Sequence, residues 1–434
     1  MLAMGRFGII EARAFFFLMD PTRGGSWHHP ADNLRAAIRN DNDAGNRNDN
    51  LGFRLAAPAN TTAAPPCRSC PGAMIMRRNI QRPPVLVGAK HRASGWAFIH
   101  SCVVMRRFGN LFEDIASPNN LWRAWREFSQ GKSRRPTVVA FAWRADQEIF
   151  HLHQELMADS YRPQGYHLKM IHEPKRRLVA AAPVRDRVVH HAIYRVLAPR
   201  LDPGLIRETW ACLPGRGSRR AEIACLGAMR KFPWRLALDI RHYFPSIDHA
   251  ILMEDVMARR IKDRRLLKLL GEICRSGDGL YRQPGMAEFL GFPPDFPPAG
   301  CGLPIGNLTS QWQANHYLSG LDHHCKRILG VPAYHRYMDD MLFFAHSKSQ
   351  LEKTRAAVAA WLWDHRRLKL KHPNAAVLST RRPMTWLGKR ISTAGINPSR
   401  RQLQKMQRRM TALVRQGDEK TIRHSVASYR GMLL

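Results

Sequence analysis

Two adjacent aspartates, Asp339 and Asp340, interrupt the apolar stretch AYHRYMDDMLFFA at residues 333–345. The apolar runs on either side predict two strands, and the aspartates between them predict the tight turn of a β-hairpin that packs on a core. Aspartate is a common turn former, so either residue alone would indicate no more than a turn. Two neighbouring carboxylates, however, repel each other unless a cation compensates them. The stretch therefore predicts an antiparallel hairpin whose turn attracts cations.

A third aspartate, Asp239, ends another apolar stretch, which predicts a buried strand at Leu236–Ile240. If this strand lies beside the hairpin, three carboxylates converge, and ligands made of oxygen alone favour Mg²⁺ or Mn²⁺. Two such ions serve in-line phosphoryl transfer: one lowers the pKa of an attacking hydroxyl, and the other stabilises the leaving pyrophosphate. These residues predict metal-dependent phosphoryl transfer and leave polymerase and nuclease open.

The charge of the chain points to a polyanionic partner. Its 434 residues include 69 Lys and Arg against 34 Asp and Glu, a formal net charge of +35, which favours nucleic acid. A basic membrane-surface protein is the alternative, but no run of 18 apolar residues is present to support a membrane partner. Eight cysteines without a disulfide pattern, and the lack of a secretory leader, favour a cytoplasmic location.

The pattern of the chain changes at about Met105. Residues 1–104 show no sustained periodicity, so we expect an N-terminal extension that is disordered or non-native. Helical patterns follow, and then residues 166–182 predict a basic β-hairpin that turns near Glu173–Lys175. A helix is expected to begin near Arg185.

Several motifs together resemble those of reverse transcriptases, in the family's order, between Leu111 and Gly388. They are IHEPKRRLVAAAPVRDRVVHHA, LALDIRHYFPSID, LPIGNLTSQWQANHYLSGLDH, YMDD and MTWLGKRI. Relatives of the group II intron and retroviral types usually carry Gln-Gly and then Ser-Pro in the third motif. Here Ile305-Gly306 is followed by Ser310-Gln311, which resembles the enzymes of diversity-generating retroelements. A group II intron or retron-type reverse transcriptase is the alternative within the family.

The resemblance implies an α+β right-hand polymerase fold. It assigns residues 105–235 to N-terminal helices and fingers, and residues 236–392 to a palm whose antiparallel sheet carries the YMDD hairpin. The reverse transcriptase domain itself would span about 150–392. Residues 393–434 would begin a short, truncated helical thumb. This segment contains a basic helix, Ser399–Gln416, with four apolar residues at helical spacing: Leu403, Met406, Met410 and Leu413.

The resemblance also implies the catalytic residues. Asp239, Asp339 and Asp340 would hold two Mg²⁺ ions, or Mn²⁺ in their place, and the backbone carbonyl of Ile240 would complete one coordination sphere. Relatives carry a lysine that protonates the leaving pyrophosphate where this chain has Pro373 or Asn374. The neighbouring Lys371 and His372 are the candidates to replace it. The missing lysine and short thumb leave a second reading open: a catalytically weak nucleic-acid-binding protein with this fold.

The residues that would bind the incoming dNTP are Lys175, Arg177, Arg185, Phe244, Gly306 and Gln311. For the three cations, a solvated basic face is the plainer alternative. Phe244 would be a steric gate against the ribose 2′-hydroxyl. Ile305, Ser310 and Gln311 would contact the template and set fidelity, with Ser310 and Gln311 also capping the helix that follows them.

The resembled enzymes copy a template-repeat RNA into cDNA with errors at adenines, and the cDNA replaces a variable repeat in a target gene. The implied partners are the RNA template, a DNA or RNA primer, dNTPs and a small basic accessory protein. Residues 18–57 are rich in Asn, whose codons AAC and AAT adenine mutagenesis diversifies without creating stop codons. We therefore expect this segment to be a translated template repeat that precedes the enzyme.

Overall fold

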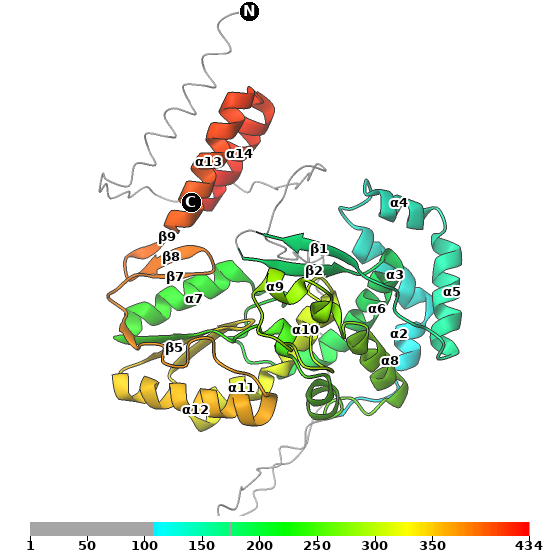
Figure 1. Ribbon diagram of the computed structural model, residues 1–434, viewed down its shortest axis with the longest axis horizontal. Coiled ribbons are helices and arrows are strands. Elements are labelled where there is room, and N and C mark those ends of the chain that lie inside the picture. Colours follow the sequence, from blue (N-terminus) through cyan, green and yellow to red (C-terminus); the bar gives the residue numbers. More distant parts are fainter. Residues whose placement is uncertain (1–106, 173–174, 434) are drawn as a thin grey trace, which may run out of the picture. The chain divides into compact units, whose positions relative to one another are not determined.

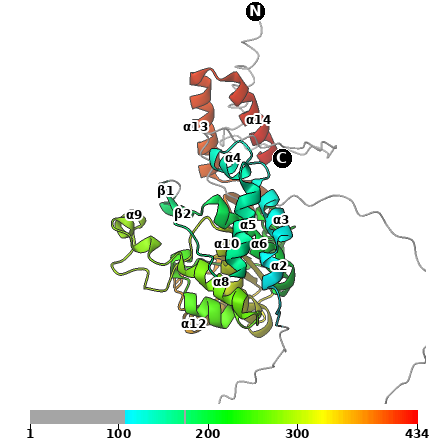
Figure 2. The same cartoon turned by 90° about the vertical axis from the view of Figure 1, so that its right-hand side faces the viewer.

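The computed structural model describes residues 107–172 and 175–433 (Figure 1, Figure 2). The predictions for residues 1–104, including the template-repeat segment 18–57, lie outside the described residues. Within the described ranges, every helix is too short or too polar to cross a membrane. The expected α+β composition with antiparallel sheets is confirmed.

The first described region is helical and packs around one long helix. Its helices are α2 (Phe112–Ala116), α3 (Pro118–Ser129), α4 (Pro136–Ala142), α5 (Ala145–Met157) and α6 (Val184–Leu201). The Ser117 hydroxyl accepts a hydrogen bond from the Asn120 amide at 3.3 Å and thereby caps α3. Most residues of α6 are buried, including Val188, Ile193 and Leu197, because α2–α5 and later elements surround it.

A β-hairpin precedes α6. Its strands are β1 (His167–Ile171) and β2 (Arg177–Ala181), and Ile171 pairs with Arg177 at its tip. The predicted hairpin is confirmed, although Glu173 and Pro174 of its predicted turn lie outside the described residues. Helix α6 begins one residue before the predicted Arg185.

The central sheet has the strand order β4–β5–β3–β6, with every pair antiparallel. Its strands are β3 (Trp234–Leu238), β4 (Ala333–Tyr337), β5 (Asp340–Ala345) and β6 (Leu378–Ser379). The structure corrects two boundaries. The strand predicted at 236–240 lies two residues earlier, and the hairpin turn is Met338–Asp339, because Asp340 already pairs with Tyr337 as the first residue of β5.

Strand β5 is buried on both faces, and its alternating side chains enter two cores. Leu342 and Phe344 pack with the helix and small sheet on one face, and Phe343 packs with the helices on the other. The first face is covered by α7 (Ser218–Lys231), β7 (Met384–Trp386), β8 (Lys389–Ser392) and β9 (Gly395–Pro398). The second is covered by α12 (Lys348–Arg366) and α11 (Ser319–His323) (Figure 1). A continuous apolar run in β5 therefore reflects burial on both sides.

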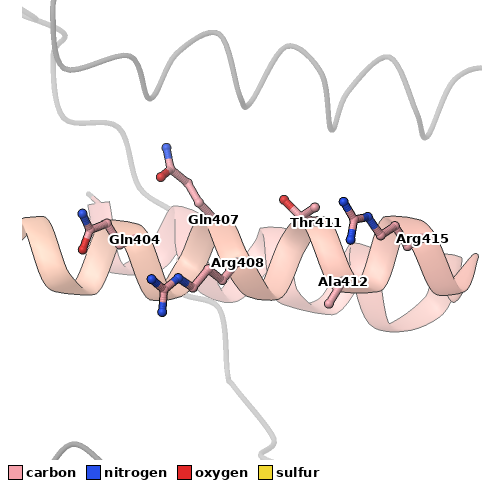
Figure 3. A pocket seen from close by; sticks show the side chains of 6 residues that line it. All are labelled: Gln404, Gln407, Arg408, Thr411, Ala412 and Arg415. Carbon is pink, nitrogen blue, oxygen red and sulfur yellow. The ribbon is translucent and has the colours of Figure 1, made fainter.

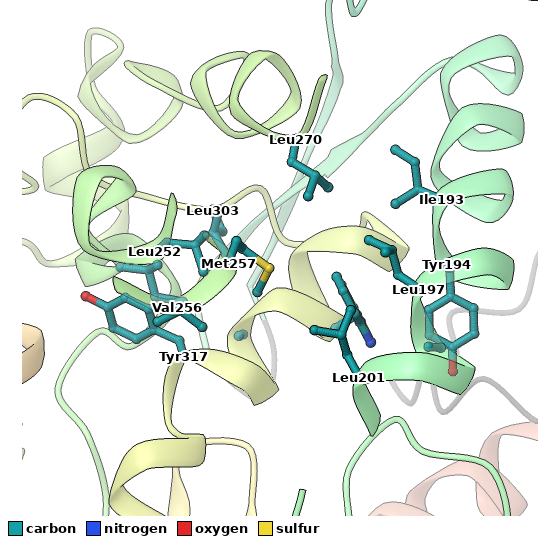
Figure 4. Close-up of a cluster of buried hydrophobic side chains, with 14 of the residues drawn as sticks. Ile193, Tyr194, Leu197, Leu201, Leu252, Val256, Met257, Leu270, Leu303 and Tyr317 are labelled. Atoms are coloured by element: carbon teal, nitrogen blue, oxygen red, sulfur yellow. The ribbon is translucent and has the colours of Figure 1, made fainter. Parts of the chain in front are cut away.

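Helices α6 and α10 (Leu308–Tyr317) join the helical region to the sheet. Figure 4 shows side chains of α6, α10 and two further helices in one apolar cluster. The further helices are η3 (Ile251–Met257) and α8 (Arg264–Arg275). Four short elements lie in the connections: η1 (Asp202–Gly204), η2 (Phe244–Ser246), η4 (Leu280–Arg282) and α9 (Met286–Leu290), and η5 (His324–Ile328) follows α11. The cluster fixes α10, which carries part of the candidate site.

The described chain ends in a helical hairpin, α13 (Arg400–Gln416) and α14 (Glu419–Leu433). The predicted basic helix is confirmed, with Ser399 as its cap: the Ser399 hydroxyl accepts from the Gln402 amide at 3.2 Å. Met406 and Met410 are buried against Tyr429 of α14, and Leu403 packs at the edge of this cluster. The side chains that line an open hollow along another face of α13 are Gln404, Gln407, Arg408, Thr411, Ala412 and Arg415 (Figure 3).

Candidate active site

Strand register brings Asp239 to the hairpin that carries Asp339 and Asp340. Strand β3 pairs with β5 up to Leu238 and Met341, so the next step along each strand places Asp239 beside Asp340. Beyond β3, a short bridge joins Ile240 to Leu370: the Lys371 amide donates to the Asp239 carbonyl at 2.8 Å, and the Arg241 amide donates to the Lys369 carbonyl at 2.9 Å. Asp239 is therefore held from two sides.

The turn that carries Asp339 has a strained backbone. Met338 has a φ of +56°, in the left-handed region that non-glycine residues rarely adopt. Such conformations cost about 1–3 kcal/mol and persist only where surrounding contacts impose them. The short turn places Asp339 and Asp340 one after the other at the end of the sheet that Asp239 also reaches.

The electrostatics show that the three carboxylates interact. Burial, followed by the charges of Asp340 and Asp239, raises the pKa of Asp339 to about 7. Burial and, to a smaller extent, the charge of Asp239 together raise the pKa of Asp340 to about 6. Asp339 and Asp340 resist ionisation because they are buried and because Asp239 carries the same charge nearby. The convergence predicted from the sequence is therefore present.

The donor set suits a hard divalent cation. Asp339 and Asp340, whose pKa values are raised in part by the charge of Asp239, gain from a compensating positive charge, and oxygen donors prefer Mg²⁺ or Mn²⁺. The carbonyls that accept hydrogen bonds in this bridge belong to Asp239 and Lys369, so the Ile240 carbonyl takes no part in it. With the side chains as they stand, no group of three or more His, Cys, Asp or Glu residues in the described ranges is arranged to hold an ion.

Lys371, one of the two candidates to replace the missing lysine, contacts the carboxylates. Its Nζ donates to Asp239 Oδ2 at 3.1 Å, and it also opposes the raised pKa of Asp340. Leu368 and Leu370 are buried while Lys369 and Lys371 are exposed, so this extended segment alternates like a strand. The alternation was a usable signal, but its pairing with the Asp239 segment was not visible in the sequence.

The three predicted triphosphate-binding cations interact with different partners. The charges of Lys175 and Arg177, on the β1–β2 hairpin, lower the pKa of Asp340 and so oppose the increase caused by burial and by Asp239. Arg185 instead pairs with Glu155 of α5, and its guanidinium lies 5.5 Å from the centre of the Tyr161 ring. The charges of Lys175 and Arg177 thus act on the carboxylates, whereas Arg185 forms its ion pair within the helical region.

The loop before α10 docks directly on β2. The Ile305 carbonyl accepts a hydrogen bond from the Ala180 amide at 2.8 Å. Gly306 has a φ of +129°, and a Cβ at this position would lie 2.7 Å from the Ala180 carbonyl oxygen. Glycine is required here because the loop backbone approaches β2 so closely. The backbone approach that Gly306 permits is therefore an approach to the β1–β2 hairpin, which carries Arg177.

The predicted capping role of Ser310 and Gln311 is wrong. Helix α10 begins at Leu308 with Asn307 as its N-cap residue, so both residues lie within the helix. Ser310 is buried. Gln311 is half-buried, and its side-chain oxygen accepts a hydrogen bond from the Cys212 thiol at 3.4 Å. Cys212 is a residue that the sequence patterns missed, since it precedes Gln311 by 99 residues.

The comparison with known families agrees with this geometry. The family described as "Reverse transcriptase (RNA-dependent DNA polymerase)" matches residues 171–391, which is half of the chain. The chain belongs to the reverse transcriptase family. The reverse transcriptase match begins in β1 and ends in β8, so it contains Asp239, Asp339, Asp340 and Lys371. Residues 171–391 are thus an RNA-directed DNA polymerase domain.

Solved structures of telomerases show weaker likeness to this reverse transcriptase. Apo telomerase from Candida tropicalis, truncated from its C-terminal domain, is 13% identical with a TM-score of 0.39, over 54% of this chain and 55% of that one. Telomerase from Candida albicans, in complex with a TWJ fragment of telomeric RNA, is 11% identical with a TM-score of 0.37, over 55% of this chain and 46% of that one. The chain spans about half the length of these telomerases. No curated protein matches it.

Phe244 is linked through its backbone to both the Asp239 segment and the loop before α10. It is half-buried at the start of η2, five residues after Asp239, and its ring contacts that of Tyr243 edge-on at 5.6 Å. The Leu303 amide donates to the Phe244 carbonyl at 2.9 Å, which ties η2 to the segment just before Ile305. The backbone thus connects the predicted steric gate with both the carboxylates and the loop before α10.

Proposed function

We propose that this reverse transcriptase copies a template-repeat RNA into cDNA, with errors at adenines, for mutagenic retrohoming in a diversity-generating retroelement. The observation that carries the polymerase activity is the convergence of Asp239 on Asp339 and Asp340 within the reverse transcriptase match. The retroelement type is supported by the motif in which Ile305-Gly306 precedes Ser310-Gln311.

The proposed division of the chain follows a right-hand polymerase. Residues 105–235 contribute N-terminal helices and fingers, including the β1–β2 hairpin. Residues 236–392 form the palm, whose central sheet carries the YMDD hairpin. Residues 393–434 begin the thumb, and the basic face of α13 suits the phosphate backbone of a template–primer duplex. Residues 1–104 would be an extension whose segment 18–57 is a translated template repeat.

Asp239, Asp339 and Asp340, with the Ile240 carbonyl, would hold two Mg²⁺ ions, or Mn²⁺ in their place. Such ions lower the pKa of an attacking 3′-hydroxyl and stabilise a leaving pyrophosphate. Lys175 and Arg177 would neutralise the triphosphate of an incoming dNTP. Lys371 takes over from the lysine that relatives carry at Pro373 or Asn374, and holds a proton beside Asp239 for the pyrophosphate.

The fidelity proposal concerns the template contact. Ile305 and Gln311 would hold the templating base more loosely than the Gln-Gly and Ser-Pro forms do. Discrimination against one mispair is worth only a few kcal/mol, so a loss of about 1.4 kcal/mol raises the error rate tenfold. The Cys212 thiol engages the Gln311 side-chain oxygen and so restricts which group of the amide can face the template.

The proposed partners are polyanions and one protein. A net charge of +35 suits an RNA template and a DNA or RNA primer. A small basic accessory protein that contacts both the enzyme and the RNA is part of the proposal. A near-copy of a neighbouring DNA segment, differing mainly at adenines, would identify the template repeat and its target gene.

Primer extension on an RNA template, with Mg²⁺ or Mn²⁺, tests the proposed activity. We expect the wild-type protein to extend the primer and the Asp339→Ala variant to bind the duplex without extending it. Duplex binding without extension by the wild type would favour the alternative of a nucleic-acid-binding protein with this fold.

Sequencing of the extension products tests the retroelement type. We expect misincorporation opposite template adenines to exceed that opposite the other bases. Equal accuracy opposite all four bases would favour a group II intron or retron-type enzyme. Mass spectrometry of the native protein tests the N-terminal proposal, because peptides from residues 23–56 at full abundance would contradict the expectation that residues 1–104 are non-native.

A further inference from the structure

Arg336 lies two residues before the catalytic turn and is fully buried. It forms a double contact with Asp322 of α11: its Nη2 lies 2.5 Å from Asp322 Oδ2, and its Nε donates to Oδ1 at 2.7 Å. Asp322 accepts two further hydrogen bonds, from the hydroxyl of Tyr334 at 2.8 Å and from that of Thr209 at 3.0 Å. The carboxylate is thus satisfied by neighbours other than water, and the guanidinium is held in one orientation.

The same guanidinium also holds the turn. Arg336 Nη1 donates to the carbonyl of Met338 at 3.1 Å, and Met338 is the residue with the positive φ immediately before Asp339. A strained turn conformation requires contacts that impose it. A hydrogen bond from a buried, doubly anchored guanidinium to the strained residue is such a contact.

A third group of contacts joins the turn to α10. Arg336 donates to the side-chain oxygen of Asn315 at 3.3 Å and to its backbone carbonyl at 3.1 Å. Asn315 lies one turn after Gln311 on α10, and its own side-chain amide donates to the Ala211 carbonyl at 2.7 Å, next to Cys212. One buried side chain therefore touches both the catalytic turn and the helix proposed to contact the template.

We propose that Arg336, oriented by Asp322, is a positioning residue that sets the place of Asp339 relative to Asp239 and Asp340 and ties it to α10. This role rests on the proposed function, because it concerns the carboxylates that would bind the divalent cations. Three neighbouring carboxylates repel each other, so other contacts must hold them close together. The hydrogen bond from Arg336 to the turn is such a contact.

The test compares two buried arginines. Arg336→Lys keeps the positive charge but cannot contact Asp322, Met338 and Asn315 together. Arg366→Lys is the matched control, because Arg366 is also buried and paired with an aspartate, Asp255, at 2.7 Å, and lies outside the turn. Binding of Mn²⁺ to the full-length protein is measured by electron paramagnetic resonance, together with kcat and KM for dNTP in primer extension.

We expect Arg336→Lys to weaken Mn²⁺ binding at least tenfold and to lower kcat by a similar factor, with a smaller change in the KM for dNTP. Arg366→Lys should bind Mn²⁺ as the wild type does. Equal Mn²⁺ affinity of folded Arg336→Lys and wild type would overturn the positioning role. A wild type that neither binds Mn²⁺ nor extends a primer would instead overturn the proposed function.

A second variant keeps the test decisive if Arg336→Lys does not fold. The double variant Arg336→Met/Asp322→Leu removes both charges, so neither remains buried without a partner. We expect it to fold, as judged by circular dichroism, and to show the same loss of Mn²⁺ affinity. Wild-type affinity in the folded double variant would show that the buried pair contributes structure alone.

Discussion

The side-chain nitrogen of Lys371 lies 3.1 Å from Oδ2 of Asp239, and the backbone amide of Lys371 donates to the Asp239 carbonyl at 2.8 Å. Backbone pairing between the two segments therefore fixes the position of Lys371, and its side chain reaches Asp239 from there. Both side chains are partly exposed, so this ion pair contributes little to stability. A lysine fixed beside a catalytic carboxylate is instead suited to the reaction.

Replacing Lys371 should slow the chemical step. In Lys371→Ala we expect the single-turnover rate of nucleotide addition to fall by about 10²-fold, the scale of a lost general acid. His372→Ala is the matched control, because His372 is the neighbouring exposed candidate for the same role. Equal rates for wild type and Lys371→Ala would assign the proton to another group, and a selective loss in His372→Ala would assign it to His372.

Stability should depend on pH through the catalytic aspartates. The folded-state pKa values of Asp339 and Asp340, about 7 and about 6, lie above the value of roughly 4 expected in an unfolded chain. Between about pH 4 and 7 the folded state therefore binds more protons than the unfolded state, and these two groups lower the stability as the pH rises. A divalent cation should counteract this effect, so Mg²⁺ should raise the melting temperature more at pH 8 than at pH 5.5.

The control for this prediction is Asp339→Asn, measured in EDTA over the same pH range. The comparison is needed because burial lowers the pKa of His190 to about 3 and of His191 to about 4, and such groups raise the stability as the pH rises. The difference in melting temperature between wild type and Asp339→Asn isolates the aspartate. A difference that stays constant from pH 5.5 to pH 8 would contradict the prediction.

A methyl group at Gly306 should disturb the loop that docks on β2. In Gly306→Ala the new Cβ would lie 2.7 Å from the Ala180 carbonyl oxygen at an unfavourable φ, so we expect a loss of about 1–3 kcal/mol in stability and at least tenfold in kcat/KM for dNTP. Gly131→Ala is the control: Gly131 also has a positive φ, +71°, but a Cβ there meets nothing within 4 Å. Equal kcat/KM in the two variants would show that the docking is dispensable.

The catalytic hairpin could be predicted because its signal is local: apolar runs flank two aspartates. The start of β3 could not, because Arg235 breaks the apolar pattern. It is nevertheless buried, and its guanidinium donates at 3.4 Å to the carbonyls of Arg382 and Pro383, far along the chain. The positive φ of Met338 was likewise not predictable, because the Arg336 guanidinium that donates to the Met338 carbonyl is held by Asp322 and Asn315 of other elements.

The same distinction explains the individual site residues. The hairpin motif predicted Lys175 and Arg177 as nucleotide-binding cations, and their charges act on Asp340. It could not show that Arg185 pairs with Glu155, 30 residues earlier, or that Lys371 reaches Asp239, 132 residues earlier. Motifs identify residue types in order along the chain, whereas these pairings depend on packing between elements that are distant in sequence.

Phe244 provides the sharpest test of the nucleotide site. If its ring blocks a ribose 2′-hydroxyl, Phe244→Val should lower the selectivity for dNTP over rNTP at least tenfold, which corresponds to about 1.4 kcal/mol. The rate with dNTP should change less, because the side chain is only half-buried and valine still fills part of its space.

The measurement is kcat/KM for one dNTP and for the matching rNTP on the same template and primer. Phe292→Val is the control, because Phe292 is another half-buried aromatic residue, packed edge-on against Phe296 at 5.0 Å and outside the proposed gate. An active Phe244→Val enzyme that rejects rNTP as strongly as the wild type would remove Phe244 from the gate. The ring would then serve only to pack against Tyr243 and tie η2 to the segment before Ile305.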